Sequence, residues 1–303
     1  MMRSLNLQEG RCVNMRSLCS RNLLLYFKNK TSVFFSLLGA MISFILFVVF
    51  LKQNMVQEWH HMPDSIKMMD LWLIGGTLSV TAITTTLTTL GRMIIDESRG
   101  VLNDFYLTDV SRFKIKISYM LSAAMIGFMM QMMMLAVMLG YFALADGLAI
   151  LWPKTVPLVI LALISALVSV AVNMLIVQFV HRVETMNAID SVISAAAGFL
   201  VGTYIPIGVL PHFAQVIIKL TPGAYVSSLY RQIMMNDQTH SIFGTGHSLT
   251  VFNQQMGVQL DWTHLLDINQ TYQVIGWIFL AGILLIFVTE LIRKSHAAVT
   301  MTN

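Results

Sequence analysis

Charged residues are scarce in this sequence, and their scarcity excludes a soluble globular protein. Asp, Glu, Lys and Arg make up 11% of the 303 residues, whereas hydrophobic residues make up 56%. A typical soluble domain is about one quarter charged, and so few charges cannot cover a surface that faces water. Lipid must therefore be the solvent for much of the chain, which predicts an all-α polytopic membrane protein.

Cysteine is also scarce, and the sequence motifs of several enzyme classes are absent. The two cysteines, Cys12 and Cys19, both precede the first long apolar run, so a disulfide framework is excluded and no metal or cofactor site is expected. Neither a G-x-x-x-x-G-K-S/T phosphate loop nor an H-E-x-x-H zinc motif occurs. The chain is therefore not expected to be an enzyme, and in particular not to hydrolyse ATP by itself.

Six apolar stretches are long enough to cross a bilayer. A transmembrane helix needs about 17 to 25 predominantly apolar residues, and windowed hydropathy identifies such stretches. The six expected spans are residues 32–51, 71–90, 117–144, 156–180, 188–204 and 272–291. Together they predict one transmembrane domain over residues 32–291, in which the fifth span is the least apolar.

Lysine and arginine are distributed unevenly between the segments that join the spans. Most of the 19 cationic residues lie before the first span, between the second and third, between the fourth and fifth, or after the sixth. Because cytoplasmic segments carry the excess of Lys and Arg, both termini are expected inside the cell, with residues 292–303 as a cytoplasmic tail. No basic face is interleaved with aromatic residues, so no nucleic acid is expected as a partner.

Residues 1–31 form the expected cytoplasmic N-terminus, and their second half is amphipathic. Between Asn14 and Lys30, leucines mix with arginines and lysines, and the stretch is not apolar enough to span. This pattern predicts an interfacial helix on the inner leaflet, where membrane lipid attracts the basic residues. A simple anchor and a contact with a partner protein both fit, and the unpatterned start leaves Met1 and Met15 open as the first residue.

Residues 91–116 are the most charged stretch and join the second and third spans on the inner side. A connection alone needs far fewer residues. Between Gly100 and Arg112, apolar residues that include Leu102 and Phe105 recur at near-helical spacing. We expect a short amphipathic helix near the membrane plane that offers a partner a rigid surface; a solvated helix without a partner is the alternative.

Residues 205–235 are apolar but are interrupted by Pro206, Pro211 and Pro222. Each proline ends or begins a helix, and the piece between Pro211 and Thr221 is too short to cross the bilayer. We expect two short helices that enter the outer leaflet and return, packed against protein or a wet cavity. The polar residues 236–270 then form an extracellular segment.

Three segments of the sequence resemble one family of membrane transporters, the ABC-2 type permeases. The inner stretch Asp96-Glu97-Ser98-Arg99-Gly100-Val101-Leu102-Asn103-Asp104 is similar to the family's acidic–Arg–Gly–small–Leu–x–acidic pattern. Val110-Ser111-Arg112 is similar to the Val-Ser-Arg that closes this pattern, although Asp109 stands where the family commonly has proline. The residues that match the family's proline-bearing outer hairpin are Pro206, Pro211, Pro222 and Arg231. The resemblance covers the whole chain in topology.

The resemblance implies a function and a set of partners. ABC-2 type permeases are the transmembrane subunits of ABC exporters, including multidrug and antibiotic-resistance systems. Such a chain moves a hydrophobic or amphipathic substrate, for example a drug, peptide or lipid, out across the bacterial plasma (inner) membrane. It pairs with a second permease subunit, identical or paralogous. A separate nucleotide-binding ATPase subunit binds the ATP and magnesium.

In this family the inner loop is the coupling helix that docks in a groove of the ATPase. The residues that the resemblance assigns to this contact are Asp96, Glu97, Arg99, Gly100, Leu102, Asp104, Phe105 and Arg112. We expect Asp96, Glu97 and Arg99 to form an ion-pair network that orients the helix, with a solvated run of charges as the alternative. Gly100 is expected to permit the turn into the helix.

The second span is rich in hydroxyl groups toward its inner half, and the fifth contains an acid. Thr84, Thr85 and Thr88, together with Asp190, are candidates to line a substrate pathway, because ionisable residues within a membrane often have a function. Threonine hydroxyls more often bond back to the i−4 carbonyl, and a shallow acid can simply reach the interface. Both interpretations stay open at this point.

Three other functional classes deserve comparison with an exporter subunit. An ATP-independent secondary transporter would normally show inverted repeats and midplane ionisable residues, and neither is evident. An intramembrane enzyme would need a nucleophile paired with a base, and none stands out. A membrane scaffold or immunity protein is not rejected by the sequence.

Overall fold

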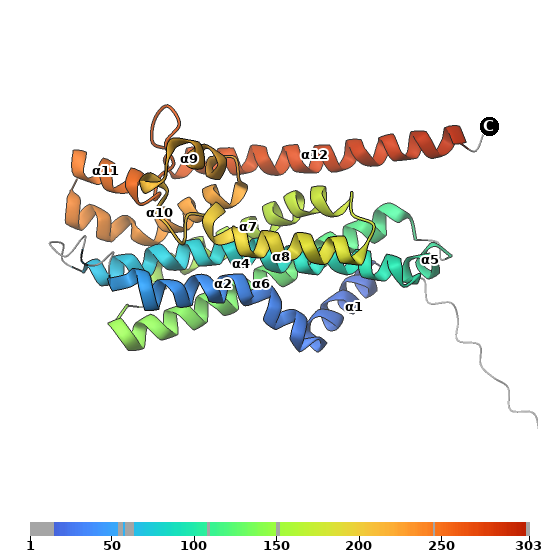
Figure 1. Ribbon diagram of the computed structural model, residues 1–303, viewed down its shortest axis with the longest axis horizontal. Coiled ribbons are helices and arrows are strands. Elements are labelled where there is room, and N and C mark those ends of the chain that lie inside the picture. Colours follow the sequence, from blue (N-terminus) through green and yellow to red (C-terminus); the bar gives the residue numbers. More distant parts are fainter. Residues whose placement is uncertain are drawn as a thin grey trace, which may run out of the picture.

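The computed structural model is an elongated bundle of helices (Figure 1). It describes residues 15–53, 57, 64–107, 110–149, 152–244 and 246–300, with only the backbone for residues 293–300. Over these ranges the single β-type interaction is an isolated bridge between Asp261 and Leu265. The chain is thus an all-α polytopic membrane protein, as its composition predicts.

The helices follow one another along the chain with short connections. They are α1 (Met15–Lys28), α2 (Lys30–Leu46), the π-helical turn η1 (Phe47–Leu51), α4 (Ser65–Ser98), α5 (Val101–Tyr106), α6 (Arg112–Asp146), the 3₁₀ turn η2 (Trp152–Lys154), α7 (Thr155–Val177), α8 (Val183–Leu200), the 3₁₀ turn η3 (Ile207–Val209), α9 (His212–Lys219), α10 (Pro222–Phe243), α11 (His247–Gln255) and α12 (Ile268–Thr300).

Five helical segments of the described chain are long and apolar enough to cross a membrane. They are Lys30–Leu51, Ser65–Ser98, Arg112–Asp146, Trp152–Val177 and Ile268–Ile292. These account for the first, second, third, fourth and sixth expected spans.

The fifth expected span, residues 188–204, differs from the other five. The structure places it in α8, which begins earlier, at Val183, and ends at Leu200. Its 18 residues rise about 27 Å, slightly less than the ~30 Å of a hydrocarbon core. Glu184, Asn187 and Asp190 lie in its first half and lower its hydropathy. α8 is therefore a marginal span by length and composition.

α4 is the central helix of the bundle, and the reason is its composition. It packs against α2, α6, α7, α8 and α10, and 89% of its most apolar window is buried, compared with 33% for α2 and 17% for α12. Small residues let neighbouring backbones approach closely. A Cβ atom at Gly76 would lie 2.2 Å from the hydroxyl oxygen of Thr203, so the chain after α8 approaches α4 there only because Gly76 lacks a side chain.

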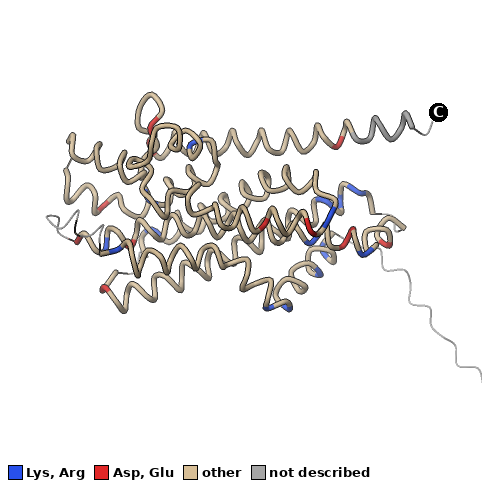
Figure 2. The backbone as a smooth tube through the Cα atoms, in the orientation of Figure 1, with Lys and Arg blue, Asp and Glu red and all other residues tan. Residues whose placement is uncertain are grey.

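The two ends of the bundle carry different amounts of positive charge. The end reached by Ser98 carries α5 and is called the α5 end, and the opposite end, which carries α11, is called the α11 end (Figure 1). Most of the lysines and arginines gather at the α5 end, whereas the middle of the bundle is nearly free of them (Figure 2). This distribution fits an orientation with the α5 end in the cytoplasm, which stays a prediction.

The expected amphipathic helix before the first span is α1, and its buried face contacts protein. Leu18, Cys19, Asn22 and Tyr26 are buried. The Cys19 thiol donates to the carbonyl of Ser118 and the Asn22 amide donates to the Ser122 hydroxyl, both on α6. α1 is therefore fastened to the bundle by side chains that an amphipathic pattern alone assigns to the lipid surface.

The proline-rich segment 205–235 forms three helical pieces instead of two short helices. η3 and α9 are short, whereas α10 has 22 residues and continues past residue 235 to Phe243. The expectation of a short second helix is therefore wrong, because Pro222 begins the helix and neither proline nor glycine occurs between Ala224 and Phe243. The Ser79 hydroxyl donates to the carbonyl of Gly223 at 2.8 Å, so α10 begins near the middle of α4.

Candidate functional site

The turn between α4 and α5 depends on a glycine. Gly100 has φ +75°, a left-handed backbone conformation that glycine adopts at little cost. It lets the chain reverse after Arg99 and begin α5 at Val101, which confirms the short helix expected there. α4 itself continues to Ser98 and α6 begins at Arg112, so both ends of the expected connection 91–116 are helical. Asp109 lies outside the described residues.

α5 has one buried and one exposed face. Leu102 is buried in the hydrophobic cluster at this end of the bundle, and Phe105 packs against the same cluster. The side chains that α5 and its flanking turns expose are Glu97, Ser98, Arg99, Asn103, Asp104, Tyr106 and Leu107. The exposed set combines both signs of charge with two large apolar groups. It is a compact surface at the tip of the bundle.

Asp96 is the centre of a buried ionic cluster that joins three helices. Its side chain is fully buried. One carboxylate oxygen accepts from the Arg21 guanidinium of α1 at 2.9 Å and from the Tyr119 hydroxyl of α6 at 2.6 Å, and the other accepts from Arg92 at 3.0 Å. Burying a carboxylate is costly unless it is paired and hydrogen-bonded. The two guanidinium groups supply positive charge to Asp96, and all three donors supply hydrogen bonds.

The expected network of Asp96, Glu97 and Arg99 does not form among the described side chains. Successive residues of an α-helix point about 100° apart, and α4 is still helical here. Asp96 therefore faces the core while Glu97 and Arg99 face outward, and neither of the two belongs to the ion pairs seen. The prediction was wrong because it treated the stretch as a loop.

Arg21 and Arg112 link α5 to its neighbours. The Arg21 guanidinium lies 5.3 Å from the centre of the Phe105 ring while it also binds Asp96. Arg112, at the start of α6, lies 4.8 Å from the centre of the Tyr106 ring. Burial by itself lowers the pKa of Arg21, but its hydrogen bond and attraction to Asp96 outweigh this, so its pKa lies above the ordinary value. α5 is thus connected to α1, α4 and α6.

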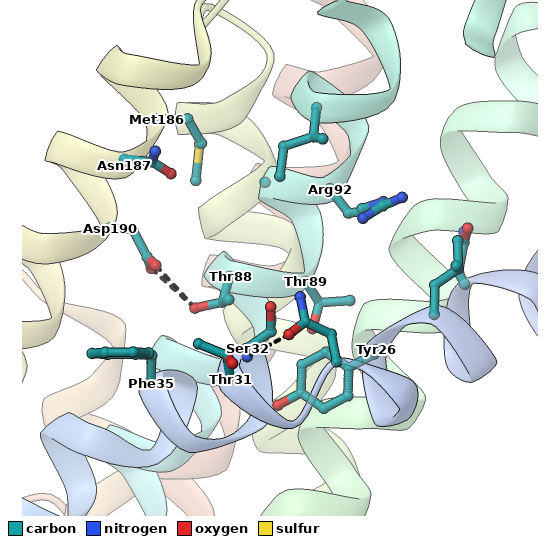
Figure 3. Close-up of a pocket in the computed structure, with 15 residues that line it drawn as sticks. Tyr26, Thr31, Ser32, Phe35, Thr88, Thr89, Arg92, Met186, Asn187 and Asp190 are labelled. Carbon is teal, nitrogen blue, oxygen red and sulfur yellow. Dashed lines mark hydrogen bonds between the residues drawn. The ribbon is translucent and has the colours of Figure 1, made fainter. Parts of the chain in front are cut away.

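A cavity of about 240 Å³ opens beside this cluster, between α1, α2, α4 and α8. Its wall includes Tyr26, Thr88, Arg92 and Asp190 (Figure 3). Both carboxylate oxygens of Asp190 lie 3.1 Å from the Thr88 hydroxyl, which donates to them. Of the four candidate pathway residues, the structure therefore brings Thr88 and Asp190 together at a cavity.

Thr84 and Thr85 have a different environment. Both side chains are fully buried. The Thr84 hydroxyl donates to the carbonyls of Ser36 and Val80, and the Thr85 hydroxyl donates to the carbonyl of Thr81. The bonds to Val80 and Thr81 follow the i−4 pattern that is common for threonine within helices, whereas the bond to Ser36 joins α4 to α2. In this structure the two residues pack α4 and line neither the cavity nor the groove described next.

A larger groove of about 680 Å³ runs between α2 and α8. Its lining is mostly apolar and aromatic and includes Phe35, Ile42 and Phe199, which are more than a third exposed. Phe35 and Asp190 line both this groove and the cavity. The groove and the cavity therefore meet at the Asp190 carboxylate.

The proline hairpin is held in place by Arg231. Pro206 and Pro211 precede η3 and α9, and Pro222 is the first residue of α10. The Arg231 guanidinium is fully buried and donates to the carbonyls of Trp72, Gly202 and Gly257, over the ring of Trp72. One side chain thus fixes the turns after α8 and α11 against α4.

Sequence reasoning missed several of the residues that build this site. Arg92 had a visible signal, because it lies four residues before Asp96 on a helix. Arg21 and Tyr119 had none, since they reach Asp96 from distant segments. Within the described part of the chain, no group of three or more His, Cys, Asp or Glu is arranged to hold a metal ion.

One family of known proteins matches the chain. The sequence model of the family described as ABC-2 type transporter matches residues 13–235. This covers α1, α5, the Asp96 cluster and the helices that line the cavity and the groove. No curated protein matches the chain as a relative. The match extends over more than half of the chain, and the chain therefore belongs to the ABC-2 type transporter family as a multi-pass membrane permease.

Proposed function

We propose that this chain is the membrane-spanning permease subunit of an ATP-driven exporter that moves a hydrophobic or amphipathic substrate out of the cell. A separate nucleotide-binding ATPase subunit, which binds ATP and magnesium, supplies the energy. The observation that carries the proposal is the exposed face of α5, where Leu107 is 88% exposed beside Tyr106 and the charges of Glu97 and Asp104. Apolar groups within a polar rim favour a protein contact.

The contacts of α5 support its role as the coupling element. A partner can shift the helices only through contacts that differ between its own states. A displacement of α5 would move Phe105, whose ring contacts Arg21. Arg21 in turn donates one of the hydrogen bonds to Asp96. The same carboxylate binds α4 and α6. The ionic cluster therefore offers a short route from the docking surface to three helices.

The proposal includes an orientation and a second membrane partner. The α5 end faces the cytoplasm of a bacterial cell, because positive charge gathers there. The chain lies in the plasma (inner) membrane and pairs with a second permease subunit, identical or paralogous. No cofactor is assigned to the chain itself.

The proposal is tested by isolating the chain from its native membrane and assaying the product for ATPase activity. Recovery of a stoichiometric nucleotide-binding subunit with vanadate-sensitive hydrolysis is the expected result. The variant that exchanges the charges of Glu97 and Arg99 (Glu97→Lys with Arg99→Glu) should insert normally but recover less ATPase, because both side chains are exposed beside α5.

A matched control exchanges the charges of an exposed pair at the α11 end, Asp64→Lys with Lys67→Asp, which lies far from α5. This control should recover as much ATPase as the unaltered chain. Recovery of the chain alone, without hydrolysis, would contradict the exporter and favour a secondary transporter or a scaffold. Equal recovery with the Glu97 and Arg99 variant would instead contradict only the docking surface.

A further inference from the structure

Among the side chains that the structure describes, Asp190 has no cationic partner. Its two carboxylate oxygens accept from a single hydroxyl, that of Thr88. None of the ion pairs among the described side chains involves Asp190. Arg92 lines the same cavity but binds Asp96 instead. A partly buried carboxylate is costly without a compensating charge, so a bound cation would complete its surroundings.

Asp190 lies at one end of the apolar groove, where the groove meets the cavity. Figure 3 shows Asp190 and Phe35 on the same side of the cavity, and both also line the groove between α2 and α8. Along α2 and η1 the groove extends from Phe35 to Leu51, a rise of roughly 24 Å. Asp190 carries the only ionisable acid or base among the lining residues that lie within α2 and α8. A ligand in this groove therefore meets one charge, at the end of the groove that is nearer to α5.

The other residues that line the groove favour a ligand whose uncharged part is apolar. This lining is mostly aliphatic and aromatic and, besides Phe35, includes Leu38, Ile42, Leu46, Phe50, Phe199 and Tyr204. Aromatic faces attract cations, and apolar pockets with one or two placed polar groups bind small molecules with a defined orientation. Gly39 packs against the carbonyl of Ser194, which brings α2 and α8 together at the floor of the groove.

We propose that Asp190 binds the positive group of a hydrophobic organic cation, whose apolar body lies in the groove between α2 and α8. This names the substrate class of the exporter and so rests on the function proposed above. The charge complementarity of Asp190 selects this occupant. A zwitterionic phospholipid also carries a cationic group, but its phosphate lies beside that group and would be brought close to the carboxylate. A second copy of the chain would cover the groove without supplying a cation from the lining residues.

The test is equilibrium dialysis of the full chain in phosphatidylcholine nanodiscs, without nucleotide or ATPase. Two probes of similar shape are compared, the cation methyltriphenylphosphonium and the neutral triphenylphosphine oxide, and binding to empty nanodiscs is subtracted. We expect the chain to bind the cation at least about tenfold more tightly than the neutral probe. Asp190→Asn should remove this preference, and Asp190→Glu should restore part of it.

The controls separate binding from folding. Asparagine has the size of aspartate and its amide oxygen still accepts from Thr88, so Asp190→Asn should keep the unfolding temperature of the unaltered chain. Glu184→Gln, an exposed acid on the same helix that lines neither the cavity nor the groove, should bind both probes as the unaltered chain does.

Equal affinity for the two probes overturns the proposal, as does unchanged binding of the cation by Asp190→Asn. Absence of binding in every variant, with lipid or a second copy in the groove, overturns it as well. The assay does not need the ATPase, so failure to recover an ATPase would contradict the proposed export function while leaving the cation preference measurable.

Discussion

Asp96 and Arg231 are both fully buried and join distant segments of this bundle, but their charges are compensated in different ways. Asp96, toward the α5 end, is bound by two guanidinium groups and a phenol hydroxyl. Arg231, toward the α11 end, is bound by three backbone carbonyls and the face of Trp72. The first centre depends on side chains from other helices, whereas the second depends on backbone.

The difference matters because side-chain partners and backbone partners respond differently to movement. Arg21 and Arg92 are each 28% exposed, so either can exchange its contact with Asp96 for water. The carbonyls of Gly202 and Gly257 belong to turns with positive φ that Arg231 holds in one geometry. We therefore expect the contacts at the α5 end to rearrange more easily than those of the hairpin toward the α11 end.

The largest expected effect is that of Arg231→Met. The substitution leaves three buried carbonyls without a donor, at about 1 kcal/mol or more each, so we expect a loss of about 3 kcal/mol or more in the free energy of unfolding. The measurement is the unfolding midpoint of the purified chain in detergent, followed by size-exclusion chromatography. Arg231→Lys keeps the charge but lacks the planar fork, and near-normal stability of this variant would contradict the need for the guanidinium geometry. Near-normal stability of Arg231→Met would contradict the importance of the carbonyls.

Asp96→Asn should cost less than Arg231→Met, about 2 kcal/mol. It leaves Arg21 and Arg92 without their carboxylate, but both reach water, which reduces the penalty below that of a fully buried pair. The measurement is again the unfolding midpoint, together with a double-mutant cycle that includes Arg21→Gln. A coupling energy of zero between Asp96 and Arg21 would show that α1 is held by its other contacts.

Tyr119→Phe should have a smaller effect, about 1.5 kcal/mol. It removes one hydrogen bond to a charged group and keeps the ring in place. If unfolding is unchanged, the two arginines satisfy the carboxylate without the hydroxyl. Tyr141→Phe, on the same helix and 40% exposed, is the matched control and should leave the midpoint unaltered.

The smallest expected effect is a difference in salt dependence. Raising the ionic strength from about 0.05 M to about 0.5 M screens partly exposed charges but scarcely affects buried ones. The destabilisation by Arg21→Gln should therefore shrink by a few tenths of a kcal/mol, while that by Arg231→Met should not change. Equal salt dependence of the two variants would remove the distinction between the two centres.

Much of the fold followed from local patterns, and the failures had a common cause. The five long spans and the short helix α5 were predicted because hydropathy and helical spacing are properties of neighbouring residues. The network of Asp96, Glu97 and Arg99 failed because the end of α4 was misplaced. The length of α10 was underestimated because the prediction gave weight to the three prolines and did not consider the residues from Ala224 to Phe243, which contain neither proline nor glycine.

The candidate site was predicted only in part. Gly100 and Leu102 were assigned to the turn and the helix where the structure places them. Thr88 and Asp190 were candidates from different spans, and the structure shows that they meet, whereas Thr84 and Thr85 serve the packing of α4. The spacing along the chain carried no information on which threonine faces a cavity, because that depends on the helices packed around α4.

The sequence by itself determined that the chain lies in lipid, that it is helical, and to which family it belongs. Charge content, the length of the apolar stretches and local motifs are properties of the chain alone. The tertiary structure decided which charges are paired. Asp96 binds Arg21 and Tyr119, Arg231 binds three backbone carbonyls, and Asp190 accepts from Thr88. These outcomes depend on the distances between segments far apart in the chain, which exist only once the helices have packed.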